Sequence, residues 1–265
     1  MNRSMLKAQA RDRIAHAAPR PMQVGLVFTI IILLISFLSY KLVLEDTFKL
    51  YMEYIDVEEI QTTSYAEFLK NFDYNDFDRQ LSRLAVSGTA SFLNSVLSLI
   101  TVIIIAGMII FSLNTLRGKD ASCWNLFDGF SIFGRVLLLY LLETVFIFLW
   151  SLLFFIPGII AYYRYSQAIF LLIDHPEMSP MACIRESSRL MYGHKWERFV
   201  LDLSFIGWLL LVYLGCCIGF AFNFPVLGMI VGIFLFPFYF LTIAGYYRTI
   251  TGDDIPNNDG WVPEI

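Results

Sequence analysis

The residues best placed to do chemistry in this sequence are charged side chains inside apolar runs. Arg164 interrupts the apolar run 159–173, and Glu143 lies within the preceding apolar run, 136–156. A charge in hydrocarbon costs at least about 2.5 kcal/mol unless it pairs, reaches the interface or lines water. Counted along two helices from a turn at 157–158, the Cα atoms of these residues differ in depth by roughly 9–10 Å. We therefore expect an internal charged pair, closed directly or through water.

This charged pair has two interpretations. In the structural one, the ion pair, or hydrogen bonds from Tyr162, Tyr163 and Tyr165, fixes the register of two neighbouring helices. In the functional one, the pair lines a path for a solute or a lipid headgroup. We favour the structural interpretation because buried ion pairs are often structural. A hydrated cavity lined by both charges would favour the functional one.

A second candidate site combines basic and aromatic residues that could contact lipid headgroups or a partner protein. In "GHKWERF", Lys195 and Arg198 flank Trp196, and Arg185 and Arg189 lie on the helix predicted just before. Aromatic side chains prefer the headgroup level, and basic side chains prefer anionic lipid. The alternative is that these residues only anchor the topology.

The sequence contains no catalytic or metal-binding motif that we recognise. It has no H-E-x-x-H, G-x-S-x-G or Walker A pattern, so we predict no catalytic residues. It has only three histidines, and its four cysteines form no C-x-x-C pair, so we predict no metal site and no cofactor. A net charge of −4, with basic residues scattered along the chain, argues against nucleic acid as a partner.

The elements that position these residues are expected to be membrane-spanning helices. The chain has 265 residues, of which 57% are hydrophobic and 16% charged, against about 25% charged in a soluble domain. Its apolar residues form blocks that, as helices, could each cross roughly 30 Å of hydrocarbon. These blocks are 24–40, 96–113, 136–156, 159–173, 205–222 and 226–247. We predict an all-α polytopic membrane protein with six transmembrane helices.

The distribution of Lys and Arg predicts the threading of the chain. Basic residues gather before the first block, between the second and third, and between the fourth and fifth. By the positive-inside rule, both termini are then cytoplasmic. The first block lacks an A-x-A-like cleavage site, so we interpret it as a retained anchor rather than a signal peptide.

Three parts of the chain follow from this threading. They are a cytoplasmic amphipathic helix at 1–22, a six-helix membrane domain at 23–248 and an acidic cytoplasmic tail at 249–265. The membrane domain includes an acidic outer loop at 44–85 and an amphipathic helix at 179–193. Both amphipathic helices are expected to lie at the cytoplasmic interface, on anionic lipid.

Small residues in the last two apolar blocks predict close helix packing. Gly215 and Gly219, and then Gly228 and Gly232, are four residues apart. This spacing places both members of each pair on one helix face, where a neighbouring helix can approach closely.

Two longer stretches resemble a known family. "LWSLLFFIPGIIAYYRYSQAIFLLIDHP" and then "RESSRLMYGHKWERFVLDLSFIGW" are similar to the bacterial integral-membrane family catalogued as domain of unknown function 975, and so is the opening "LKAQARDRI". The resemblance covers nearly the whole chain. It implies a polytopic bacterial membrane protein with no established activity, distantly similar to membrane domains attached to glycerophosphodiester phosphodiesterases.

These observations favour a non-enzymatic accessory or scaffold protein of the bacterial cytoplasmic membrane. Its expected partners are membrane lipids and, as a candidate, another membrane protein. A carrier or channel for a small solute or lipid is the first alternative. A lipid-acting membrane enzyme is the second, and it would require several convergent polar groups at one membrane depth. The sequence leaves the substrate, the partner and the oligomeric state open.

Overall fold

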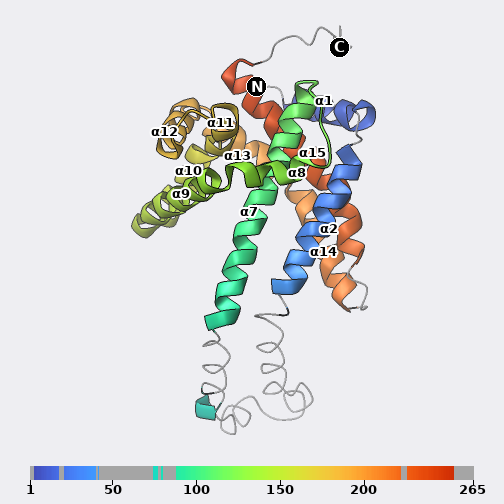
Figure 1. Ribbon diagram of the computed structural model, residues 1–265, viewed down its shortest axis with the longest axis vertical. Coiled ribbons are helices and arrows are strands. Elements are labelled where there is room, and N and C mark those ends of the chain that lie inside the picture. Colours follow the sequence, from blue (N-terminus) through green and yellow to red (C-terminus); the bar gives the residue numbers. More distant parts are fainter. Residues whose placement is uncertain are drawn as a thin grey trace. The chain divides into compact units, whose positions relative to one another are not determined.

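Helices make up the part of the chain that the structure describes. The computed structural model describes residues 3–17, 21–39, 41, 74–76, 79, 88–221 and 226–253, and no strand lies among them. Its helices (Figure 1) are α1 Arg3–His16, α2 Pro21–Ser39, α7 Gly88–Leu116, α8 Asn125–Asp128, the 3-10 helix η2 Gly129–Ile132, α9 Phe133–Leu153, α10 Phe155–Tyr165, α11 Ala168–Asp174, α12 Pro180–Leu190, α13 Lys195–Leu203, α14 Ile206–Ala221 and α15 Val226–Thr251. The predicted all-α class is confirmed.

Six helical stretches among the described residues are long and apolar enough to cross a membrane. They are Pro21–Ser39, Ser91–Leu116, Asn125–Leu153, Phe155–Asp174, Lys195–Gly215 and Gly232–Thr251. These stretches confirm the six spans predicted from the apolar blocks. The fourth and fifth stretches are each built from two helices, α10 with α11 and α13 with α14.

The turn between α9 and α10 lies earlier than the sequence predicted. The chain reverses at Phe154, whose backbone is extended, rather than at Pro157 and Gly158. Pro157 falls in the first turn of α10, where a missing N–H breaks no helical hydrogen bond. Gly158 is buried because α9 passes beside it, and a Cβ there would collide with Ser151.

The chain divides into two compact units. One consists of Met1–Ile30 with Val102–Ile265, and the other of Ile31–Thr101. All contacts discussed below lie within the first unit. The predicted outer loop 44–85 lies outside the described residues except for 74–76 and 79, and residues 254–265 of the predicted tail also lie outside them.

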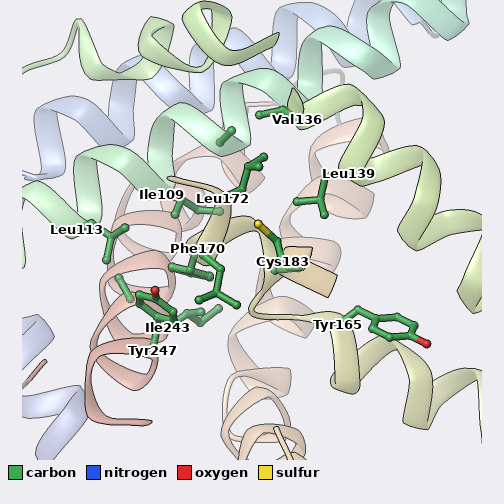
Figure 2. Packing of buried hydrophobic residues seen from close by; sticks show 14 of the residues in the cluster. Ile109, Leu113, Val136, Leu139, Tyr165, Phe170, Leu172, Cys183, Ile243 and Tyr247 are labelled. Carbon is green, nitrogen blue, oxygen red and sulfur yellow. The ribbon is translucent and has the colours of Figure 1, made fainter. Parts of the chain in front are cut away.

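The core of the first unit joins helices that are distant in sequence. One cluster of buried side chains includes Ile109 and Leu113 of α7, Val136 and Leu139 of α9, Leu172 of α11, Cys183 of α12 and Ile243 of α15 (Figure 2). The rings of Phe170 and Tyr247 stack with their centroids 5.1 Å apart. Between membrane helices, close packing of this kind, rather than water exclusion, supplies much of the stability.

The N-terminal helix packs on protein. Leu6 and Ala10 are buried, and α1 packs against α15. Lys7 Nζ lies 4.4 Å from the centroid of the Phe205 ring, and burial together with the nearby Arg11 lowers the Lys7 pKa. Helix α15 covers Leu6 and Ala10 but leaves Met5 exposed, and the position of α1 at the cytoplasmic interface stays a prediction.

Candidate functional site

The fourth span is interrupted at Ser166 and Gln167, between α10 and α11. A break in a membrane helix frees backbone groups that must find new partners. The side chain of Ser187 in α12 is the partner of two of these backbone groups. Its hydroxyl donates to the Arg164 carbonyl oxygen at 3.0 Å and accepts from the Gln167 amide at 3.2 Å. Helix α12 therefore caps the interruption with a side chain from outside the span.

Arg164 lies in the last turn of α10, directly before this break. Its Nε donates to Ser188 Oγ, and its guanidinium carbon lies 5.9 Å from the centroid of the Tyr165 ring. The side chain is half-buried. Among the described contacts, its two terminal amino groups meet no protein acceptor. Arg164 thus carries a cationic group within a span, with part of its donor capacity unused.

Glu143 lies on α9 and is half-buried. Within the described part of the chain, no hydrogen bond or ion pair joins it to Arg164. The direct pair that the sequence suggested is therefore not formed there, because the arginine side chain turns to Ser188 of α12. The sequence could not show this choice, since it predicted α12 as a helix on the membrane surface.

The helix predicted at 179–193 is present as α12, which has Ser179 as its N-cap and ends at Leu190, while its place at the cytoplasmic interface stays a prediction. Ser179 Oγ accepts from the Ala182 amide at 3.3 Å. Cys183, Ile184 and Ser187 form the buried face of α12, whereas Met181 is 41% exposed. The helix packs against α9 and α11, so its phase is set by protein contacts and not by a flat membrane surface.

The outer face of α12 and the start of α13 carry a group that we call the basic–aromatic surface, consisting of Arg185, Arg189, Tyr192, Lys195 and Trp196, all exposed except Lys195, which is half-buried. Arg189 and Trp196 are strongly exposed, with 78% of the Arg189 side chain and 71% of Trp196 accessible. The Glu186 carboxylate lies 2.6 Å from Arg189 Nη2, and this hydrogen bond raises the Arg189 pKa. Tyr192 was not among the predicted residues.

Aromatic contacts hold this surface to α10. The ring of Trp196 stacks on Phe199 with centroids 5.1 Å apart. Phe199 in turn meets Tyr163 of α10 edge-to-face at 5.7 Å. Helices α10, α12 and α13 therefore form one packed corner, with Arg164 and Ser188 between the first two.

Arg198 does not belong to the exposed surface, which corrects its prediction as a lipid or partner contact. It is only 4% exposed and pairs with Asp202 at 2.9 Å. Tyr239 donates to Asp202 at 3.2 Å, and the ring centroid of Tyr246 lies 5.8 Å from the arginine carbon. The periodicity of α13 turns Arg198 inward, where it joins α13 to α15.

A second charged group joins the ends of three spans. Arg117, just beyond α7, donates to both carboxylate oxygens of Asp174, at 2.6 and 2.7 Å. Its Nη2 also donates to Asp253 Oδ2 at 2.7 Å. The hydrogen bond to Asp174 raises the Arg117 pKa. Arg248 adds donors to the Leu116 and Asp253 carbonyl oxygens, both at 3.0 Å.

A cavity of about 720 Å³ lies beside Arg117. Apolar side chains such as Ile110 and Leu172 line part of it, and Lys119 and Asp128 line another part. Neither Glu143 nor Arg164 is among its lining residues. The charges at this cavity are largely occupied in holding helix ends together.

The structure describes the surroundings of two of the four predicted packing glycines. Gly215 is buried, and a Cβ on Gly232 would come within 3.5 Å of Thr29 Cγ2 in α2. The surroundings of Gly219 and Gly228 lie outside the described residues. The structure adds Gly25 of α2, where a Cβ would collide with the side chain of Pro237 in α15.

Sequence reasoning missed the Arg117 group. The basic residues between the second and third apolar blocks were used only to predict the threading, and no partner was predicted for Arg117 or Asp174. A usable signal was present: Arg117, Asp174 and Asp253 each follow an apolar block, and the predicted threading puts all three block ends on one side.

One comparison with known proteins gives a match. The model of a family described as "Protein of unknown function (DUF975)" matches residues 152–254. A search of curated proteins and a search of solved structures matched nothing. The matched residues include the interrupted span, α12 and the basic–aromatic surface. The resemblance predicted from the sequence is thus confirmed over residues 152–254, which are similar to the family of domain of unknown function 975.

Proposed function

We propose that this multi-pass membrane protein is a non-enzymatic accessory or scaffold protein of the bacterial cytoplasmic membrane. It binds anionic lipid through the basic–aromatic surface and presents its membrane helices to a partner protein. The observation that carries this proposal is the exposure of Arg185, Arg189 and Trp196 on one corner of α12 and α13.

Buried residues of α12 and α13 hold the backbone of this corner in place. Ser187 and Cys183 of α12 are fully buried, and Arg198 of α13 is fixed by Asp202. A surface whose backbone is already held in place loses little entropy when it binds a lipid. Basic side chains near an anionic leaflet contribute about 1 kcal/mol each, and an interfacial tryptophan adds a preference for headgroup depth.

The carrier alternative receives less support. It predicts a hydrated cavity lined by Glu143 and Arg164, whereas the cavity beside Arg117 is lined by neither. The enzyme alternative needs polar groups free to act on a substrate. Asp174 and Asp253 are instead engaged by Arg117, at 2.6 and 2.7 Å. The accessory role therefore accounts best for the side chains that remain exposed.

Tryptophan quenching tests the lipid contact. The protein is placed in nanodiscs that contain brominated phosphatidylglycerol or, at the same fraction, brominated phosphatidylcholine. Subtracting the signal of Trp196→Phe isolates the Trp196 emission. We expect stronger quenching by the brominated anionic lipid, and loss of this difference in the double variant R185Q/R189Q. Lys119→Gln, at another exposed basic site, is the matched control and should keep the difference.

Equal quenching of the wild-type protein by the two lipids would refute the lipid contact. Native mass spectrometry of protein extracted with its own lipids tests the accessory role separately. The expected result is a partner protein in fixed stoichiometry. A lone protein that carries a small solute would favour the carrier instead.

A further inference from the structure

We propose that Arg164 binds a phosphate group of an anionic phospholipid, in the corner between α10, α12 and α13. This inference rests on the proposed lipid-binding surface and names a deeper, more specific contact beside it. It assigns a ligand to a charge that the described contacts of the chain leave incompletely paired.

The first step is the state of the Arg164 side chain. It lies in the membrane-spanning stretch Phe155–Asp174, where a guanidinium must pair, reach the interface or line water. Its Nε is engaged by Ser188 Oγ, but within the described residues its terminal amino groups have no acceptor. The half-buried side chain remains accessible to a molecule from outside.

The second step is the shortage of free acids around it. Glu186 is held by Arg189 at 2.6 Å, and Asp202 is held by Arg198 at 2.9 Å. Glu197 lies 3.0 Å from His194 Nδ1. No described contact brings Glu143 to the arginine. Three of these acids are engaged by other residues, and the described contacts give Arg164 no carboxylate partner, so its positive charge calls for an anion that the described chain does not provide.

The third step is the chemistry of the donors. The two terminal amino groups of a guanidinium match two oxygens of a phosphate, and such bidentate pairs are stronger than single neutral hydrogen bonds. Ser188 Oγ accepts from Arg164 Nε and so keeps its own hydrogen to donate to a phosphate oxygen. Arg185 precedes Ser188 by three residues on α12, so the two share a helix face and Arg185 adds a second cation.

The fourth step concerns the source of the phosphate. The flank of the corner is apolar and aromatic: Ile160 is 48% exposed and Tyr162 is 50% exposed, both on α10. A soluble phosphate compound has nothing to place against these side chains, whereas a phospholipid has acyl chains. We therefore commit to a lipid headgroup phosphate, and the experiment distinguishes it from a soluble one.

The test is native mass spectrometry of the full chain in detergent, titrated with phosphatidylglycerol or phosphatidylcholine. We expect one tightly held phosphatidylglycerol. Arg164→Gln should weaken its binding about tenfold or more, the loss expected when about 1.4 kcal/mol of charged hydrogen bonding is removed. Arg164→Lys, which keeps the charge but loses the bidentate geometry, should fall between. Lys119→Gln, at an exposed basic site outside the basic–aromatic surface, is the control, and it should lose less than threefold.

Three outcomes would overturn the inference. Wild-type binding retained by Arg164→Gln would show that the phosphate sits elsewhere; if R185Q/R189Q then lost the Trp196 quenching difference, the proposed function would still stand. Displacement of the lipid by inorganic or glycerol phosphate at equal concentration would assign the site to a soluble phosphate. Weaker lipid binding that appears in Arg164→Gln and Arg164→Lys only in proportion to a lowered melting temperature would mark Arg164 as structural only.

Discussion

Arg117 and Asp174 form a two-point contact in which Nη1 and Nη2 of the guanidinium each donate to one carboxylate oxygen, at 2.6 and 2.7 Å. The contact joins the end of α7 to the end of α11. The same guanidinium also donates a hydrogen bond to Asp253, which lies beyond α15. Only 21% of the Arg117 side chain and 13% of the Asp174 side chain are exposed. One cation thus fixes the ends of three spans.

Replacing this cation should loosen the helix ends. We expect Arg117→Gln to lower the free energy of unfolding by about 1–3 kcal/mol, because hydrogen bonds to charged groups contribute about that much and two carboxylates lose their partner. Thermal unfolding in detergent measures the change. Arg185→Gln, which removes an exposed cation, should change it by less than about 0.5 kcal/mol. Equal melting temperatures for the two variants would contradict the role of Arg117.

Ser187, which caps the interrupted span, should protect the break more strongly than its neighbour Ser188 does. Ser187→Ala removes both the donor to the Arg164 carbonyl and the acceptor of the Gln167 amide. We expect faster hydrogen exchange at the Gln167 amide and a loss of about 1–3 kcal/mol, the cost of leaving buried polar groups unpaired. Ser188→Ala is the control, since Ser188 bonds a side chain and not the broken backbone. The capping role fails if both variants exchange alike at Gln167.

Substitution by alanine should have different effects on stability at two glycines of the chain. At Gly107 in α7 a Cβ would collide with the backbone of Leu126 in α8, whereas at Gly134 in α9 nothing lies within 4 Å. We expect Gly107→Ala to destabilise by about 1–3 kcal/mol through overpacking, and Gly134→Ala to be neutral or stabilising by up to about 1 kcal/mol. Denaturant or thermal unfolding compares them. A neutral Gly107→Ala would show that α7 and α8 do not pack closely.

Glu186, an acid that pairs with Arg189 of the basic–aromatic surface, should weaken the attraction of this surface for anionic lipid. Glu186 lies 2.6 Å from Arg189 and offsets its charge. We expect Glu186→Gln to increase the preference for brominated phosphatidylglycerol over phosphatidylcholine at Trp196, because Arg189 keeps its charge and gains freedom to reach the lipid. The increase should shrink at high salt, as an exposed electrostatic contact does. A reduced preference at low salt would contradict this role.

The sequence by itself determined the class and the number of spans. Each of the six apolar blocks predicts a helix from local properties alone, since length and hydropathy decide whether a segment can cross a membrane. The cap at Ser179 was equally predictable, because a capping side chain contacts backbone only a few residues away.

Only the tertiary structure decided which charges meet. Arg164 turns to Ser188 and not to Glu143, Arg198 turns inward to Asp202, and Arg117 reaches Asp174 and Asp253. These choices depend on how far each helix is rotated about its axis and which helix lies beside it. A single sequence specifies the spacing of side chains along one helix but not the phase between two, because that phase is set by packing contacts between residues distant in the chain.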